Sequence, residues 1–209
     1  MKQINSTTII VAVGIIALIG ALFYFGGKNK SVAPASTAAD SHHPSAGQNV
    51  SLASLNGMLE QPAPSFYLTD RGGKIYSSDN LKGKNVILFF NEGLMCYPAC
   101  WNQIVSFAKD DRFEANDITV LSVVIDSKED WQWAINKMPE LAEATVVFDA
   151  DASVAKKFGV LSTPSSMHPG SFPGHTYVAI DAAGIVRYVF DDPSMAIRND
   201  LLITEVSKF

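Results

Sequence analysis

Hydrophobic and polar positions divide the chain into three stretches of different character. Residues 9–25 carry no charged or strongly polar side chain. Residues 28–57 are rich in Ser, Ala, Pro, Gly and Asn without an apolar period, and beyond them short apolar runs alternate with polar segments. As a helix, the first stretch would be roughly 26 Å long, close to the hydrocarbon thickness of a bilayer. The pattern predicts a transmembrane anchor in residues 1–27, a linker over 28–57 and one folded domain over 58–209.

The flanks of the apolar run bear on its processing and orientation. Three aromatic residues close the run at positions 23–25, where a cleaved signal peptide would have small residues, so we expect an uncleaved anchor that contacts the membrane through residues 8–26. Lys2 on one side and Lys28 and Lys30 on the other nearly balance, so charge alone does not give the orientation. A cysteine pair that cycles through a disulfide suits an oxidising compartment. We therefore expect a single-pass protein of the cell membrane with its C-terminal domain on the extracytoplasmic side.

The apolar runs of the third stretch predict a sheet covered on both faces. Residues 85–90 and 118–125 are short, mainly apolar runs without alternation, typical of buried parallel strands, and residues 97–109 between them have helical apolar spacing. Further strands are predicted at residues 65–69, 74–76, 146–148, 176–180 and 185–190, and helices at residues 127–138, 151–158 and 196–208. This order predicts an α/β thioredoxin-like fold with an N-terminal β-hairpin extension.

Local signals complete the predicted elements. Ser127 is expected to cap the helix over 127–138 and Asp151 the next one. Trp131 and Trp133 are expected to be packing residues rather than ligand contacts. An irregular Ser/Pro/Gly segment is expected at residues 161–174.

Composition narrows the classes of partner. The chain has 209 residues, enough for one domain of about 150 residues plus the two N-terminal segments. The net charge of -5 and the lack of a Lys/Arg cluster argue against a nucleic-acid partner. His42 and His43 stand in the linker without further ligands at metal-binding spacing, which indicates a solvated linker feature.

The only two cysteines, Cys96 and Cys100, follow the strand predicted at residues 85–90. If Cys96 lies in the first turn of the next helix, free N–H groups and the helix dipole favour its thiolate, which makes it the candidate nucleophile. Residues four apart in an ideal helix are about 6.2 Å apart, within reach of a disulfide. Two other interpretations stay open: buried cysteines that only pack, and a zinc site completed by His168 and His175.

Several motifs resemble the alkyl hydroperoxide reductase/thiol-specific antioxidant family, the peroxiredoxin-like redoxins, over residues 61 to about 190. The resemblance is carried by residues 63–70, 81–84 and 86–90 and by the hairpin that contains Gly184. The block over residues 89–101 is similar to a branch of that family with a C-x-x-C-W centre, widened here by one residue.

The resemblance implies a thioredoxin-fold oxidoreductase that needs no cofactor. Its substrate would be a peroxide or a protein disulfide. Cys96 would attack, Cys100 would resolve the sulfenic acid or mixed disulfide, and an external dithiol such as a thioredoxin-like protein would reduce the product.

Two positions depart from the pattern of typical peroxiredoxins. Gly93 stands where the family has a Thr three residues before the first cysteine, and His175 stands where it has an Arg. The Thr hydroxyl and the guanidinium position the peroxide in that family, so the departures weaken the prediction of a peroxidase more than that of a redox centre. His175 is a candidate acid/base, hydrogen-bond donor or metal ligand, or a solvated residue at the start of a strand.

Two further families share this layout. Sco copper-delivery proteins are also membrane-anchored thioredoxin folds with a C-x-x-x-C pair and a distant His, which would make Cys96, Cys100 and His175 soft ligands for copper. Disulfide reductases of cytochrome maturation share the fold but usually have a W-C-x-x-C centre. The residues around the pair favour the redoxin interpretation.

Overall fold

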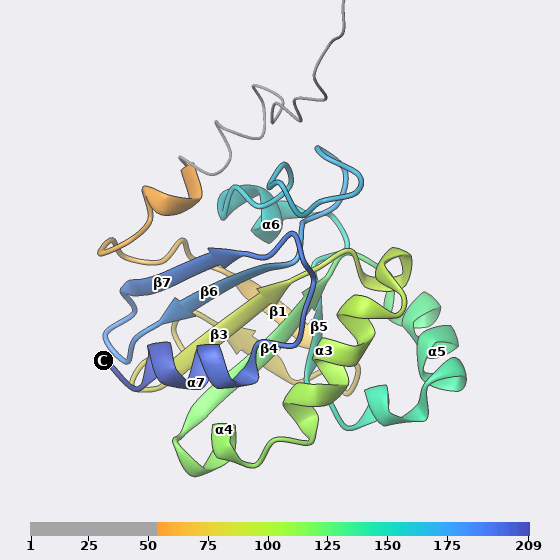
Figure 1. Ribbon diagram of the computed structural model, residues 1–209, viewed down its shortest axis with the longest axis horizontal. Coiled ribbons are helices and arrows are strands. Elements are labelled where there is room, and N and C mark those ends of the chain that lie inside the picture. Colours follow the sequence, from red (N-terminus) through yellow and green to blue (C-terminus); the bar gives the residue numbers. More distant parts are fainter. Residues whose placement is uncertain (1–53) are drawn as a thin grey trace, which may run out of the picture. The chain divides into compact units, whose positions relative to one another are not determined.

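The computed structural model describes residues 54–209 (Figure 1). The predicted anchor over residues 1–27, and the linker up to residue 53, lie outside the described residues. Within residues 54–209, no helix is both long enough and apolar enough to cross a membrane. Leu55, three residues before the predicted domain boundary at residue 58, is already buried against the domain.

Seven strands form one mixed sheet in the order β2-β1-β5-β4-β3-β6-β7. β3 is parallel to β4, and β4 is parallel to β5, whereas β6, β7, β1 and β2 join the sheet through antiparallel pairs. The strands are β1 (Tyr67–Asp70), β2 (Ile75–Ser77), β3 (Asn85–Phe90), β4 (Ile118–Val124), β5 (Val146–Phe148), β6 (Thr176–Ile180) and β7 (Val186–Asp191).

Helices cover both faces of this sheet. One face packs against α3, α4, α5 and α7, and the other against α6 and the segment around Leu55 (Figure 1). The helices are α3 (Ala99–Ala108), α4 (Arg112–Ala115), α5 (Lys128–Lys137), α6 (Ser153–Lys157) and α7 (Asn199–Val206), with the 3-10 turns η1 (Gly93–Cys96) and η2 (Pro139–Ala142).

The central strand β3 explains why this layering forms. Successive side chains of a strand point to opposite faces. Ile87 and Phe89 enter the core beneath α3, whereas Val86, Leu88 and Phe90 enter the core beneath α6. All five side chains are at most 3% exposed. The prediction of a thioredoxin-like α/β fold with an added N-terminal hairpin, β1 and β2, is confirmed.

Some details differ from the sequence-based expectations. The helix predicted over residues 97–109 begins only at Ala99, and α4 and η2 are too short to give a periodic signal. The carboxylate that accepts hydrogen bonds from the N–H groups of Val154 and Ala155 in α6 is Asp149, whereas Asp151 reaches only Ser153. Ser127 caps α5 as expected, because its hydroxyl accepts the Asp130 N–H at 3.0 Å.

The two tryptophans of α5 have different surroundings. Trp131 is buried at 1% exposure, whereas Trp133 is 55% exposed and packs its ring edge-on against that of Trp101 at a centroid distance of 6.0 Å. The reason is helical geometry, because residues two apart lie on different faces of a helix.

Candidate active site

The register between β3 and β6 brings two distant segments together. Phe90, the last residue of β3, pairs with Thr176, the first residue of β6. His175 therefore lies beside the segment that follows β3 and carries both cysteines. The solvated alternative for His175 is excluded, because its side chain is 1% exposed.

The segment between β3 and α3, residues 91–98, is anchored by buried polar groups. Asn91 accepts the Gly93 N–H at 2.9 Å, and the indole N–H of Trp101 donates to the Gly93 carbonyl at 2.9 Å. Asp126, after β4, accepts the Leu94 N–H at 3.1 Å. Three side chains from three elements thus fix the backbone that leads to Cys96.

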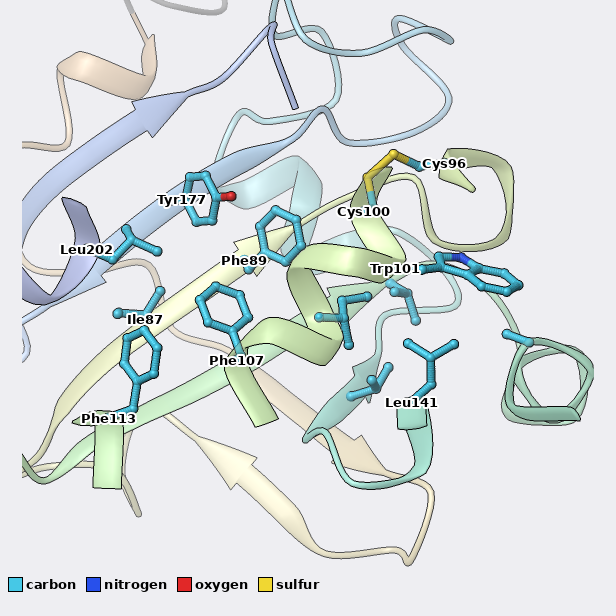
Figure 2. Close-up of a cluster of buried hydrophobic side chains, with 14 of the residues drawn as sticks. Ile87, Phe89, Cys96, Cys100, Trp101, Phe107, Phe113, Leu141, Tyr177 and Leu202 are labelled. Atoms are coloured by element: carbon cyan, nitrogen blue, oxygen red, sulfur yellow. A yellow bond between two sulfur atoms is a disulfide. The ribbon is translucent and has the colours of Figure 1, made fainter. Parts of the chain in front are cut away.

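Cys96 and Cys100 form a disulfide with a Cα–Cα distance of 5.4 Å. Figure 2 shows the bond at the N-terminal end of α3, above a cluster of aromatic rings. The expectation that Cys96 lies in the first turn of the helix is wrong: Cys96 ends η1, and Cys100 is the second residue of α3. Pro98 separates the two turns, because α3 begins directly after it. Cys100 thus lies in the first turn of α3 and Cys96 precedes the helix, with both bonded sulfurs at the helix N-terminus.

His175 contacts the inner of the two sulfurs. Its Nδ1 lies 3.4 Å from the Cys100 Sγ, and its Nε2 lies 2.7 Å from the Tyr177 hydroxyl. The Phe89 ring packs edge-on against the imidazole at a centroid distance of 4.6 Å. Burial lowers the pKa of His175 to about 4, so the ring is neutral at physiological pH.

Cys96 is the outer sulfur of the pair. Its neighbours in the chain, Met95 and Tyr97, are 54% and 48% exposed. Its Sγ lies 3.9 Å from the Met195 Sδ, which comes from the loop between β7 and α7. Both cysteines are buried, Cys96 at 2% and Cys100 at 1% exposure, so Cys96 is the outer one only in the sense that exposed residues flank it.

The loop that carries Met195, residues 192–198, is organised by one buried carboxylate. Asp192 accepts hydrogen bonds from the backbone N–H groups of Ser194 and Ala196 and from the Arg198 guanidinium. Burial would raise the pKa of Asp192, but the hydrogen bonds from Arg198 and Ser194 outweigh it and hold this pKa well below its usual range. Met195 itself has a positive φ of 49°, which a non-glycine residue adopts only when its surroundings impose it.

Glu92 holds a second loop against the site. Its buried carboxylate accepts the Met167 and His168 N–H groups at 2.5 and 3.0 Å and the Ser166 hydroxyl at 3.1 Å. Its other oxygen lies 3.1 Å from the His168 Nδ1. The contacts of Glu92 with His168 therefore hold the irregular segment over residues 161–174 in place. His168 does not belong to the cluster of Cys96, Cys100 and His175.

A third contact region ties Tyr97, between the two cysteines, to α5. The Lys137 ammonium lies over the rings of Tyr97, Trp133 and Trp101, at centroid distances of 3.8, 5.1 and 5.8 Å. The exposed Trp133 thus has a role beside the cysteine pair that its position in the sequence did not indicate.

Asp126 explains why position 93 is a glycine and not the Thr of typical peroxiredoxins. A Cβ added to Gly93 would lie 1.7 Å from the Asp126 Oδ2, and Gly93 has a positive φ of 56°. The carboxylate therefore occupies the space into which a side chain at position 93 would project. Burial raises the pKa of Asp126 to about 6.

Replacing Asp126 by Asn tests this buried charge. The raised pKa means that the folded protein favours the protonated form of Asp126. The free energy of unfolding of the wild type is therefore highest below pH 4, where Asp126 is protonated, and it falls as the pH rises through about 6. We expect Asp126→Asn to match the wild type near pH 4 and to be more stable by about 1–2 kcal/mol at pH 7.5, after allowing for partial solvent screening. Chemical denaturation at both pH values measures the difference. His175 titrates over part of this range in both proteins and cancels in the comparison. A wild type that is the more stable protein at pH 7.5 would contradict the assignment.

The structure brings all three site residues predicted from sequence into one cluster. One ligand-type atom from each of Cys96, Cys100 and His175 lies within 4.8 Å of the other two. Sequence reasoning missed Tyr177, Gln103, Met195 and Asp126. Tyr177 lies two residues after His175 and thus on the same face of β6, which is the one signal that pointed to it.

The fold and the site define a thioredoxin-fold protein with a disulfide between two cysteines at the N-terminal end of α3. The AhpC/TSA family matches residues 59–189. This match covers more than half of the chain, and the chain belongs to the AhpC/TSA family.

Individual relatives are peroxiredoxins. The chain is 29% identical to the chloroplastic peroxiredoxin Q of Triticum aestivum over 135 residues, which are 62% of this chain and 57% of the relative. It is 30% identical to that of Sedum lineare, covering 62% of this chain and 66% of the relative. The chain thus spans slightly less than two thirds of the length of these relatives.

Solved structures agree on the fold. Peroxidoxin BcpB from Mycobacterium tuberculosis has a TM-score of 0.60 at 20% identity, covering 73% of this chain and 97% of that one. The reduced 2-Cys peroxiredoxin of Plasmodium vivax has a TM-score of 0.61 at 20% identity, covering 72% and 95%.

Proposed function

We propose that this protein is a peroxiredoxin-like thiol oxidoreductase that reduces peroxides through a Cys96/Cys100 dithiol-disulfide cycle. The observation that carries the proposal is the buried disulfide with His175 Nδ1 at 3.4 Å from the inner sulfur. Membership of the AhpC/TSA family and the peroxiredoxin Q relatives support the same chemistry.

The cycle has three steps. The Cys96 thiolate attacks one peroxide oxygen, the O–O bond breaks, and the products are a sulfenic acid on Cys96 and an alkoxide that takes a proton to become the alcohol, or water when the substrate is hydrogen peroxide. The Cys100 thiol then attacks the Cys96 sulfur, gives its proton to His175, and the S–O bond breaks to release water. An external dithiol reduces the disulfide by exchange and becomes a disulfide itself.

The outer position of Cys96 supports its role as the attacking sulfur. Cys100 contacts His175 in the interior, which suits a thiol that reacts within the protein. A thioredoxin-like dithiol protein is the proposed reductant. A protein disulfide is the alternative substrate, because a mixed disulfide on Cys96 would be resolved by the same attack of Cys100.

Peroxide and disulfide turnover measured together test this function. We expect the purified 209-residue protein to consume hydrogen peroxide and dithiol in equal amounts, and to do so faster than it reduces a model protein disulfide. Rapid reduction of the protein disulfide without consumption of peroxide would instead assign the protein as a disulfide reductase. Inactivity in both assays would contradict the proposal.

The same three side chains favour a second candidate function, copper binding. In the reduced protein, two thiolates and the imidazole Nδ1 form a soft donor set, and the Met195 thioether adjoins Cys96 at 3.9 Å. Titration of the reduced protein with Cu(I) distinguishes the functions. Tight binding of one equivalent without peroxide turnover would support copper delivery as in Sco proteins, whereas turnover in metal-free buffer supports the redoxin cycle.

We also propose that residues 1–27 anchor the protein in the cell membrane with the domain outside the cytoplasm. The uncharged run over residues 9–25 and the disulfide chemistry support this placement. Protease treatment tests it: the domain should be degraded in spheroplasts and protected in inverted vesicles. The opposite pattern would overturn the orientation.

A further inference from the structure

A chain of hydrogen bonds leads from the disulfide through the core to α7. It runs from the Cys100 Sγ to His175, Tyr177, Gln103 and Asn199. His175 and Tyr177 come from the segment of β6, Gln103 from α3 and Asn199 from α7. The four side chains are at most 6% exposed. Because these side chains are buried, the surrounding protein groups decide which partner donates and which accepts in each hydrogen bond.

The outer end of the chain fixes the orientation of both amides. The Asn199 Nδ2 donates to the Ser106 carbonyl at 3.0 Å and to the Asp110 carboxylate at 2.9 Å, two groups that only accept. The Asn199 Oδ1 is therefore the atom that accepts from the Gln103 Nε2, at 2.8 Å. This leaves the Gln103 Oε1 as an acceptor facing inward, where the backbone N–H of Arg198 donates to it at 2.7 Å.

Within this chain of hydrogen bonds, the inner end then has one proton arrangement that keeps every bond, and the backbone of Ala196 is a further hydrogen-bond partner of the His175 ring. The Tyr177 hydroxyl donates its single proton to the Gln103 Oε1 at 3.1 Å. Its oxygen must therefore accept from the His175 Nε2 at 2.7 Å, which places the proton of the neutral imidazole on Nε2. Nδ1 then carries the lone pair of the neutral ring, 3.4 Å from the Cys100 Sγ. With the proton on Nδ1, Tyr177 would have to turn its proton toward His175 and give up its bond to Gln103.

We infer that Tyr177, Gln103 and Asn199 are positioning residues that hold His175 in the tautomer able to accept the proton of the Cys100 thiol. This inference rests on the proposed function for its place in the cycle, the step in which Cys100 attacks the Cys96 sulfur. In that step the S–H bond of Cys100 breaks, the new S–S bond forms, and His175 Nδ1 holds the proton until it joins the departing group.

Nitrogen NMR of the histidine rings tests the inference directly, because protonated and unprotonated ring nitrogens have well separated shifts. In the reduced full-length protein at pH 7, with histidine labelled by nitrogen-15, we expect His175 to carry its proton on Nε2 alone. In Tyr177→Phe, which lacks the acceptor, we expect both tautomers to be populated. Tyr188→Phe, on the neighbouring strand β7 and outside the hydrogen-bond chain, is the matched control and should keep the wild-type spectrum.

A kinetic readout without peroxide accompanies the spectra. The Cys96 thiolate exchanges with a chromogenic aromatic disulfide, which forms a mixed disulfide and releases one coloured thiol, and the attack of Cys100 on the Cys96 sulfur then releases the second, whose rate is the readout. We expect this release to slow by roughly tenfold in Tyr177→Phe, the effect of losing one hydrogen bond, and to be unchanged in Tyr188→Phe. Thermal unfolding confirms that both variants are folded.

The two proposals fail in different ways. A wild-type protein with the His175 proton on Nδ1 would overturn the inference, as would a Tyr177→Phe variant with wild-type tautomer and release rate. Because neither readout uses peroxide, the absence of peroxide turnover would count against the proposed function alone.

Discussion

Cys96→Ser is expected to lower peroxide consumption to the background of the uncatalysed reaction, a loss of at least about a thousandfold. The thiolate is the nucleophile of the first step, and a serine hydroxyl is not ionised at neutral pH and cannot form a sulfenic acid. Peroxide loss coupled to oxidation of a dithiol measures the effect. Consumption that persists at more than a few per cent of the wild-type rate would contradict the assignment of Cys96.

Cys100→Ser is the matched comparison, because it changes the same atom at the other end of the disulfide. We expect this variant to reduce one equivalent of peroxide and to keep the Cys96 sulfenic acid, which a dimedone-type reagent traps and mass spectrometry detects. Turnover with a dithiol protein should fall strongly, since no internal thiol completes the cycle. If the sulfenic acid were instead found on Cys100 in Cys96→Ser, the two roles would be reversed.

Gly93→Ala is expected to destabilise the protein by about 2–4 kcal/mol. A left-handed φ costs a non-glycine residue about 1–2 kcal/mol, and displacing the Asp126 carboxylate from its hydrogen bond to Leu94 adds a similar amount. Chemical denaturation measures the loss, and the rate of peroxide reduction should fall with it because Gly93 begins the turn that carries Cys96.

Gly184→Ala separates the two costs. Gly184 also has a positive φ, of 84°, but a Cβ there has no atom within 4 Å, so this variant measures backbone strain alone. The double variant Gly93→Ala/Asp126→Ala should regain most of the difference between the two glycine variants. Equal losses in Gly93→Ala and Gly184→Ala would show that the carboxylate does not restrict position 93.

The parts of the fold that could be predicted from sequence are those with a strong local pattern. β3 and β6 have the predicted bounds, because uninterrupted apolar runs at this length form buried strands. The start of α3 could not be predicted, because Pro98 fits both a first helical turn and the residue before one. The cysteine in the first turn of α3 is therefore Cys100, where the sequence predicted Cys96.

The site was predictable only as far as its residue types are rare. Two cysteines in 209 residues, and one histidine at the start of β6, direct attention to Cys96, Cys100 and His175. Gln103, Asn199 and Met195 are ordinary residues of helices and loops, and only the tertiary packing of α3 against α7 brings them to the cysteines. Asp126 was hidden for the same reason, since its contact with Gly93 spans two parallel strands.

The loop over residues 192–198 contacts the surroundings of both cysteines, in one case with a side chain and in the other with the backbone. Met195 reaches Cys96 with its side chain, whereas Arg198 reaches Gln103 with its backbone N–H. The Arg198 side chain also pairs with the buried carboxylate of Asp192, so a change of side chain at position 198 would disturb the loop and, with it, the backbone N–H that donates to Gln103. At position 195, in contrast, each exchange alters what an incoming substrate meets beside the outer sulfur. Within this short loop, position 195 is therefore the place where a side chain can change beside Cys96 while the bonds of Asp192 and Gln103 are kept.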